Sequence, residues 1–420
     1  MRLRDYTVPN AVPHYSCAVS PGRHCPLFGA AAVLRGISGT TLMYIGTQDC
    51  VYYAQKDALT RQASQNGIKG LRTLAVQLSD EDLIFGIRPQ LQSLLEKEAQ
   101  REDTEAIFLV TSCSVEVISE DLRSVTEAVS RKSGKRIALV PTENFKTFSY
   151  IEGIEDTIKV LTENMQPCEK QPKTFAILGA RQPGADECEP VKYLLERGYV
   201  LHSILPYRTN EKLVKSLPGV EFTVVVDGSG VDVGLRLQEE FGVPCVRFDC
   251  KLDLDSIVSA WKKLGEITGE NLAEWLLTKK NEVSELTEKV RGKVEGKTFF
   301  YGQKVIYPFE ACLFLTQLGM IPTCIFLGSV VDKTDATRLK LAEKHNPVIW
   351  QNANQSAIHA MLEENMPDYC VGIVGGVMRK YPVAVTSLSV SPIECGFAFY
   401  RYVLERLLNA DKPEVLHEGI

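Results

Sequence analysis

Hydrophobic and polar positions along this chain follow two alternating patterns. Short apolar runs that end in Gly or Pro are typical of buried strands, and the first part of the chain has such runs at residues 41–45, 71–76, 106–110 and 137–141. Apolar residues spaced three or four positions apart predict helices between these runs, at residues 80–98, 115–130 and 154–163. Pro89 is expected to split the first helix or to start its second half. On that helix, Leu83 and Ile84 are expected to share an apolar side with Leu91.

The same alternation repeats twice more. A second cycle predicts strands at residues 174–179, 200–205, 221–226 and 243–248, and helices at residues 186–197 and 271–290. A third predicts strands at residues 297–302, 322–328, 348–351 and 369–374, and helices at residues 308–318, 333–344, 355–364 and 394–408. Such alternation implies parallel sheets with right-handed crossovers, so the fold class is α/β with three doubly wound domains. We place these at residues 1–168, 169–295 and 296–420, with the first boundary in the polar, Pro-bearing stretch 166–172.

Composition narrows the range of functions. The net charge of -6, from 47 basic and 53 acidic residues, makes a nucleic-acid-binding surface unlikely. No apolar run approaches the roughly 18 residues that span a bilayer, and the first residues lack an apolar signal core. We therefore expect a cytoplasmic protein without a membrane partner. In that compartment disulfides are disfavoured, so metal binding or burial must account for most of the 12 cysteines.

Three of these cysteines, Cys25, Cys50 and Cys113, sit among small or turn-forming residues. A thiolate placed where a strand gives way to a loop or a helix start can point its sulfur out of the sheet. Backbone N–H groups there can bond to inorganic sulfide, and a helix N-terminus favours the negative charge of an iron–sulfur cluster. Three thiolates leave such a cluster short of a protein ligand, unless another subunit or another residue completes it.

The segments around these cysteines carry a specific resemblance. Residues 25–30 (CPLFGA), 46–53 (GTQDCVYY) and 111–122 (TSCSVEVISEDL) resemble the P-cluster motif of the nitrogenase molybdenum–iron protein β subunit. Weaker likeness continues at residues 265–297, 301–303 and 367–372, so the resemblance covers nearly the whole chain. It implies the nitrogenase component 1 fold of three Rossmann-like domains. It also implies that Cys25, Cys50 and Cys113 ligate a P-cluster-like 8Fe–7S or a 4Fe–4S cluster.

The resemblance further implies a subunit of a nitrogenase-like reductase complex, an oxidoreductase that is active only with its partners. Its cluster would accept electrons from an ATP-dependent iron protein and pass them to a substrate or cofactor site. The partner chain would be a homologous α-type subunit or a second copy of the chain itself. Dinitrogen, a tetrapyrrole and a carbon–sulfur compound are all possible substrates. The main alternative is a non-catalytic scaffold for nitrogenase cofactor assembly, and a weaker one is a cluster-free α/β binding protein.

The sequence departs from the family wording at several positions. Asp49 stands where the family has glycine before the second cysteine, which affects the size or the hydrogen bonding of the cluster. No cysteine occupies Val225–Ser229, the region in which α-type relatives place their cofactor ligand. We therefore expect any large catalytic metallocluster to belong to a different chain. The alternative is an organic substrate bound directly near this chain's cluster.

Other polar residues have weaker functional interpretations. Cys17 is either a spare ligand or a loop cysteine, and Ser114 and Asp49 are either oxygen ligands or capping and turn residues. His359 is expected to be a packed helix residue. The loop Gly179–Gly184 follows a predicted strand but lacks both the G-x-G-x-x-G pattern and a lysine, so nucleotide binding there is not expected. The other cysteines are expected to be mostly buried, with Cys312, Cys324 and Cys370 in the core and a weak metal spacing at Cys245 and Cys250.

Overall fold

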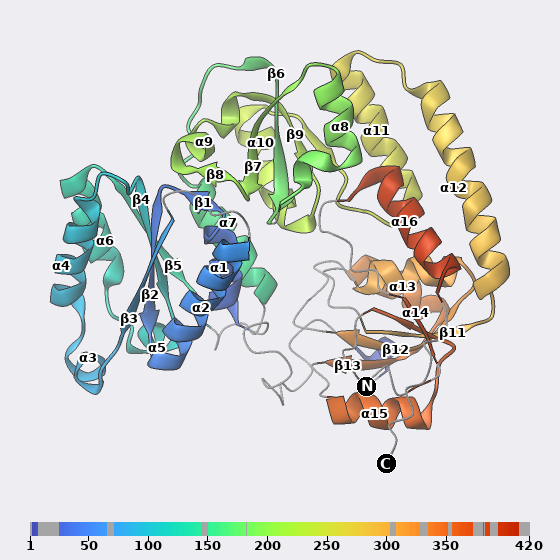
Figure 1. Cartoon of the computed structure of the whole chain (residues 1–420), viewed down its shortest axis with the longest axis horizontal. Coiled ribbons are helices and arrows are strands. Elements are labelled where there is room, and N and C mark those ends of the chain that lie inside the picture. The colour runs from blue at the N-terminus through green and yellow to red at the C-terminus, as the bar shows by residue number, and fades with distance from the viewer. Residues whose placement is uncertain are drawn as a thin grey trace. The chain divides into compact units, whose positions relative to one another are not determined.

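The structure is a computed structural model that describes residues 2–6, 25–64, 71–143, 150–181, 183–302, 308–327, 335–351, 355–372, 381, 383–386 and 394–410. Helices and strands alternate through these residues, and three parallel sheets contain most of the strands (Figure 1). The predicted α/β class with several parallel sheets is therefore confirmed. The chain divides into two compact units, one of Gly22–Asp186 with Val191–Arg247 and one of Met1–Pro21, Glu187–Pro190 and Phe248–Ile420. The predicted boundaries after residues 168 and 295 stay predictions.

The first sheet has the strand order β3-β2-β4-β5. Its strands are β2 (Thr40–Gly46), β3 (Arg72–Gln77), β4 (Ala106–Thr111) and β5 (Arg136–Pro141), all paired in parallel. Every residue of the two central strands, β2 and β4, is buried, which explains why both read as continuous apolar runs. The helices of this part are α1 (Pro26–Leu34), α2 (Gln48–Ser64), α3 (Asp80–Phe85), α4 (Arg88–Ala99), α5 (Cys113–Ile118), α6 (Leu122–Ser133) and α7 (Tyr150–Thr162).

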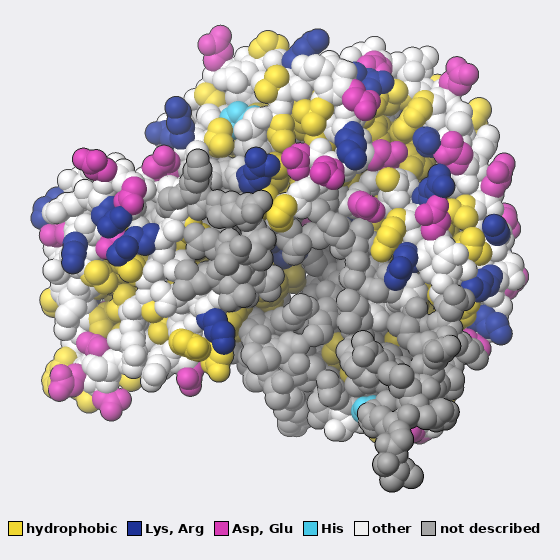
Figure 2. Space-filling view, viewed as in Figure 1, with side chains coloured by type: hydrophobic (Ala, Val, Ile, Leu, Met, Phe, Trp, Pro, Cys, Tyr) yellow, Lys and Arg dark blue, Asp and Glu magenta, His cyan; other side chains and the backbone are white. Residues whose placement is uncertain are grey.

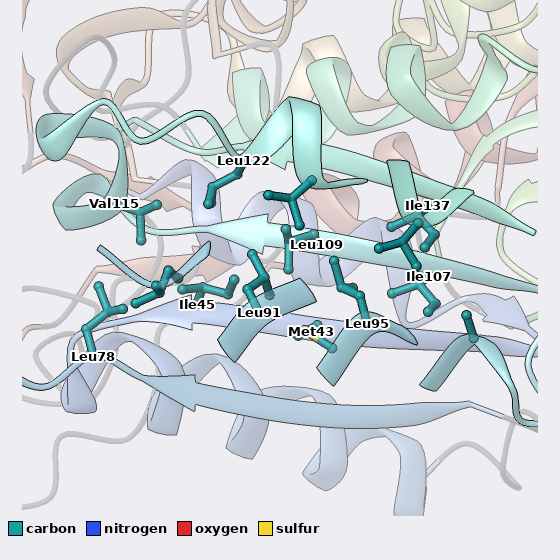
Figure 3. Close-up of a cluster of buried hydrophobic side chains, with 14 residues drawn as sticks. Met43, Ile45, Leu78, Leu91, Leu95, Ile107, Leu109, Val115, Leu122 and Ile137 are labelled. Atoms are coloured by element: carbon teal, nitrogen blue, oxygen red, sulfur yellow. The ribbon is translucent and has the colours of Figure 1, made fainter. Parts of the chain in front are cut away.

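A core cluster of buried side chains packs one face of this sheet against α4 and α6 (Figure 3). Met43 and Ile45 on β2 lie beside Ile107 and Leu109 on β4, and Leu91 and Leu95 of α4 close over them. Val115 extends the cluster to α5 (Figure 3). The short helix that begins with Cys113 is thus held against the sheet by its own apolar residue.

Two predicted helices are each divided in the structure. The predicted helix at residues 80–98 breaks at Gly86, whose φ of 83° ends α3, and Pro89 lies in the first turn of α4, as expected. This break turns Ile84 away from the core, so the expectation that Leu83 and Ile84 share the side of Leu91 is wrong. The predicted helix at residues 115–130 is interrupted by Ser119 in the left-handed conformation, after which Asp121 caps α6 through the N–H of Ser124.

The second sheet has the order β10-β9-β6-β7, again parallel throughout. Its strands are β6 (Gln171–Ala180), β7 (Val200–Pro206), β9 (Val220–Val225) and β10 (Cys245–Arg247). The helical elements between them are η2 (Ala185–Glu187), α8 (Glu189–Glu196), α9 (Glu211–Lys215), η3 (Leu217–Gly219), η4 (Gly228–Gly230) and α10 (Val231–Phe241). A small parallel pair, β1 (Ile37–Ser38) and β8 (Thr209–Asn210), connects the region of the first sheet to that of the second.

The other unit contains the third sheet, of order β13-β12-β11-β14-β15. Its strands are β11 (Thr298–Tyr301), β12 (Ile321–Leu327), β13 (Val348–Gln351), β14 (Tyr369–Val371) and β15 (Ala384–Thr386). Its helices are η1 (Leu3–Asp5), α11 (Leu254–Thr268), α12 (Ala273–Val294), α13 (Pro308–Gln317), α14 (Asp335–Lys344), α15 (Gln355–Glu364) and α16 (Gly396–Leu408). Among the described residues, none of the helices combines the length and the apolar character that crossing a bilayer requires.

Acidic and basic side chains are interspersed over the face drawn in Figure 2. This distribution agrees with the near balance of 47 basic and 53 acidic residues in the sequence.

A candidate metal centre at the edge of the first sheet

Each of the three predicted ligand cysteines lies at the start of a helix. Cys25 is the N-cap residue of α1, Cys50 lies in the first turn of α2, and Cys113 is the first residue of α5. α2 follows β2 and α5 follows β4, and these two strands are neighbours in a parallel sheet, so Cys50 and Cys113 lie at the same carboxyl edge. Cys25 interacts electrostatically with both of the other cysteines. The structure therefore brings together all three residues that the sequence predicts as ligands.

The electrostatics of this group do not suit three free thiolates. Burial raises the pKa of Cys25 from 9.0 to about 11, and the neighbouring Cys50 and Cys113 raise it further, against hydrogen bonds from the backbone N–H groups of Leu27 and Phe28. Burial likewise raises the pKa of Cys113, and the charge of Cys50 adds to this effect. Its own backbone N–H and that of Ser114 lower it.

Deprotonating Cys25 and Cys113 beside Cys50 thus calls for a cationic partner at the group. A bound metal supplies that positive charge and deprotonates the thiols that ligate it. The backbone N–H groups at the two helix starts would also serve as donors to cluster sulfur. The residues present therefore fit an iron–sulfur cluster.

A single metal ion and a cluster place different demands on their thiolates. Within the described part of the chain, no group of three His, Cys, Asp or Glu side chains is placed to hold one metal ion. One ion of the zinc type requires its thiolates at about 2.3 Å from a common point. An iron–sulfur cluster accepts thiolates on different iron atoms, so its cysteine sulfurs stand farther apart.

A close crossing of α1 and α7 positions Cys25. A Cβ added to Gly153 of α7 would lie 2.5 Å from Cα of Pro26 and nearer still to its carbonyl oxygen. A Cβ on Gly29 of α1 would likewise lie 2.9 Å from the backbone nitrogen of Ile154. Only glycine permits backbones to approach this closely. The first turn of α1, and with it Cys25, is therefore fixed by two glycines that lie far apart in the sequence.

A second close approach positions Cys113. Gly46 ends β2, and a Cβ there would lie 2.6 Å from Cβ of Ser112 and closer to its hydroxyl oxygen. The backbone N–H of Ser112 donates to the carbonyl of Ile45 (2.8 Å). The Ser112 and Ser114 hydroxyls share a hydrogen bond of 2.8 Å, which gives Ser114 a local structural partner. Asp49 is exposed in the first turn of α2, where a carboxylate complements the helix dipole.

The remaining cysteines follow the burial prediction in most cases. Cys312, Cys324 and Cys370 are buried, as expected for core residues. Cys168 is exposed, and Cys17 lies outside the described residues. The other four are Cys188, Cys245 and Cys395, which are buried, and Cys250, which is partly exposed.

His359 is packed as predicted. Its Nδ1 lies 2.7 Å from the hydroxyl of Tyr381. The described residues contain no metal-ion group, so neither His359 nor the Cys245–Cys250 spacing forms a single-ion site there.

Sequence reasoning missed an exposed apolar region near the same edge. Phe85 keeps 85% of its surface exposed, Ile84 74% and Val117 67%, and these residues lie on α3 and α5. The carboxylate of Glu120 accepts hydrogen bonds from the N–H groups of Ile87 and Arg88, which fastens the α3–α4 turn to the segment after α5. In the sequence, Gly86 could have indicated this exposure. It ends α3 and interrupts the apolar face of the helix predicted at residues 80–98.

Comparisons with known proteins agree with this architecture. Residues 25–401 match the family model described as "Nitrogenase component 1 type Oxidoreductase". A solved structure described as "Nitrogenase Cp1 at pH 6.5" superposes with a TM-score of 0.74 at 16% sequence identity, covering 95% of this chain and 94% of that one. At this identity the superposition shows the fold alone.

Curated relatives fall into two groups. The nitrogenase iron-molybdenum cofactor biosynthesis protein NifE of Methanococcus maripaludis is 20% identical over 393 residues, or 90% of this chain and 79% of that protein. The NifE of Clostridium pasteurianum is 21% identical over 85% of this chain. The nitrogenase molybdenum-iron protein alpha chain of Methanosarcina barkeri is 23% identical over 66% of this chain and 54% of its own length. The specific likeness to a β subunit stays a prediction.

Proposed function

The chain belongs to the nitrogenase component 1 type oxidoreductases, and from this we propose that it holds an iron–sulfur cluster through Cys25, Cys50 and Cys113 as one subunit of a nitrogenase-type complex. The observation that carries the proposal is the convergence of three thiols from three helix starts, two of which, Cys25 and Cys113, have pKa values raised by burial and by neighbouring cysteines. When bound, the cluster supplies low-potential redox chemistry. The protein supplies the thiolates, the backbone donors and a position at the sheet edge.

The role best supported for this subunit is in the assembly of a nitrogenase-type cofactor. Two relatives that match 90% and 85% of the chain are named as cofactor biosynthesis proteins. The alpha-chain match of Methanosarcina barkeri covers only 66% of the chain. This favours the scaffold alternative over the electron relay implied by the motif resemblance. Because Val225–Ser229 has no cysteine, the chain would act beside a companion that ligates the large cofactor.

Electron relay from an ATP-dependent iron protein is the second candidate role. The observation that favours it is the exposure of Ile84, Phe85 and Val117 on helices at the edge that carries the cysteines. Large exposed side chains of this kind are enriched at protein–protein interfaces. The acidic first turn of α3, with Asp80, Glu81 and Asp82, would favour a partner with basic side chains around its own contact.

The companion chain would also complete the cluster. Three thiolates leave a cluster of four or more irons short of protein ligands, and the cysteine pair at the α2 and α5 starts lies at the carboxyl edge of the first sheet. A homologous α-type subunit or a second copy of the chain could supply the missing ligands. We propose a dimeric or tetrameric complex with the cluster between chains.

Single cysteine substitutions test the ligand assignment. Cys25→Ala, Cys50→Ala and Cys113→Ala are each expected to remove or degrade the cluster, measured as iron and acid-labile sulfide per chain after anaerobic purification. Cys168→Ala is the matched control, because Cys168 is an exposed free thiol whose loss leaves no cavity. Iron loss as large in the control as in the three variants would refute the assignment.

In vitro turnover separates the two roles. The complex with its companion chain and an ATP-dependent iron protein would reduce a substrate catalytically if it is a relay. A scaffold would instead accumulate and release a cofactor precursor without substrate turnover.

A further inference from the structure

Two buried cysteines outside the candidate metal centre lie in contact with each other. Cys188 directly precedes α8, and Cys395 is the N-cap residue of α16, more than two hundred positions later in the sequence. Cys188 keeps 1% of its surface exposed and Cys395 0%, and both are free thiols. A hydrogen bond joins the two thiols. Both segments belong to the same compact unit of the chain.

An independent contact holds these two segments together. Glu189, the residue after Cys188, extends its carboxylate to the start of α16, where Oε2 accepts a hydrogen bond from the N–H of Ala398 (3.0 Å). Gly396 has a φ of 74°, and a Cβ there would lie 2.6 Å from the same oxygen. Cys395 itself makes no side-chain capping bond. The first turn of α16 is therefore capped by Glu189, and this cap keeps the two cysteines adjacent.

The closed contact protects the thiol of Cys395 from reaction. Burial raises its pKa well above the ordinary value of 9.0, and the hydrogen bond and the charge of Cys188 raise it further. Only a thiolate attacks a disulfide, so Cys395 is unreactive while the contact is closed. Lys251, whose Nζ lies 5.4 Å from the ring centroid of Phe399, lowers this pKa. Once the contact opens, water removes the effect of burial, and the lysine and the helix start then favour the thiolate.

We propose that Cys188 and Cys395 form a reversible disulfide by exchange with a low-molecular-weight disulfide when the start of α16 opens. The thiolate of Cys395 attacks one sulfur of the small disulfide, which breaks its S–S bond and releases one thiolate. The thiolate of Cys188 then attacks the sulfur of Cys395 in the mixed disulfide and releases the second. Two protein thiols lose two electrons and two protons, and the small disulfide is reduced to two thiols. Disulfides that form transiently in this way are compatible with a reducing compartment.

The disulfide would fix the start of α16 to the segment before α8. A disulfide that closes a long loop removes more chain entropy from the unfolded state than one that closes a short loop. The oxidised protein should therefore unfold at a higher temperature than the reduced protein. The inference does not depend on the iron–sulfur cluster or on either proposed role, because its residues and the three candidate ligands belong to different compact units.

Thiol trapping in the full-length, anaerobically purified protein tests this pair. The protein is incubated with glutathione disulfide, blocked with N-ethylmaleimide and digested, and mass spectrometry should detect a peptide pair joined through Cys188 and Cys395. Dithiothreitol should separate the two peptides again. Glu189→Ala removes the cap of α16 and should speed formation of the link about fivefold, because the population of the open form rises by the factor that a lost helix cap represents.

Cys324 and Cys370 provide the matched control. Both are buried, and Phe300 of β11 pairs with Cys324 of β12 on one side and with Cys370 of β14 on the other. Two strand spacings separate them by roughly 9–10 Å, beyond the about 7 Å that a disulfide can bridge without backbone movement. These two cysteines should stay unlinked.

Three results would overturn the proposal. The first is the absence of the link between Cys188 and Cys395 in the wild type. The second is a link that forms no faster in Glu189→Ala than in the wild type. The third is a link between Cys324 and Cys370 that forms as fast, because oxidation would then follow general unfolding and not the opening of α16.

Discussion

Replacing Gly153 with alanine should dislodge Cys25 without touching any cysteine. The new Cβ would lie 2.5 Å from Cα and 2.7 Å from the carbonyl carbon of Pro26, whereas ordinary contacts of this type begin near 3.4 Å. One of the two helices must therefore move by at least about 0.9 Å, because the carbonyl oxygen of Pro26 lies nearer still. The obstructing atoms are backbone, so no side-chain rotation can relieve the clash. Pro26 is the residue directly after Cys25, and the movement would therefore reach the thiol.

The effect of Gly153→Ala on the free energy of unfolding can be bounded from two known contributions. Overpacking a well-packed contact costs about 1–3 kcal/mol. Replacing glycine by alanine inside a helix returns roughly 0.5–1 kcal/mol. The net loss in the free energy of unfolding is thus between about 0 and 2.5 kcal/mol, which leaves most of a typical domain stability in place. Metal–ligand distances tolerate only about 0.2 Å, so cluster occupancy should fall more than stability does.

The assay pairs iron and sulfide content with denaturant unfolding of the anaerobic protein. Gly292→Ala is the control, because Gly292 also lies inside a helix, α12, but a Cβ there meets nothing within 4 Å. This control should gain roughly 0.5–1 kcal/mol and keep its iron. Full iron content in Gly153→Ala, or a gain in stability equal to that of the control, would show that the α1–α7 crossing does not position Cys25.

Two further predictions concern pH and the exposed apolar side chains. In metal-free protein the folded-state pKa of Cys25, about 11, exceeds its ordinary value of 9.0, so the folded state keeps the proton longer and stability should decline as the pH rises from 9.0 toward 11. Cys25→Ser should flatten this decline in the unfolding free energy, and an unchanged slope would contradict the burial of the thiol. Phe85→Ser should leave unfolding within about 0.5 kcal/mol of the wild type but weaken association with a protein partner, measured by anaerobic light scattering or electron uptake. Leu277→Ser, at a side chain 61% exposed on α12, should change neither, and identical behaviour of the two variants would argue against a contact at Phe85.

The sequence pattern predicted the sheets well because buried parallel strands have a strong signature. β2 and β4 are apolar along their whole length, since helices cover both faces, and each ends at a small or hydroxyl-bearing residue. The three cysteines could be singled out as candidate ligands because the motifs that flank them are short stretches of sequence. Helix breaks were less predictable, since Ser119 adopts a left-handed conformation that serine rarely favours.

Features that depend on tertiary neighbours could not be predicted in this way. Gly29 and Gly153 are more than a hundred residues apart, and only the α1–α7 crossing shows why both must be glycine. Cys188 and Cys395 are in contact although more than two hundred positions separate them, and such a contact leaves no local signal in the sequence. The exposure of Ile84 follows from the break at Gly86, which separates α3 from α4, whereas periodicity alone placed Ile84 on the side of Leu91.

The central claim is that this chain holds an iron–sulfur cluster through three thiolates. The most direct test is the iron and acid-labile sulfide content per chain of anaerobically purified protein, together with electron paramagnetic resonance of its reduced form. We predict a coloured protein that contains iron and sulfide in comparable amounts and gives a low-temperature signal on reduction. A colourless protein without iron or sulfide would contradict the claim and favour a cluster-free α/β binding protein.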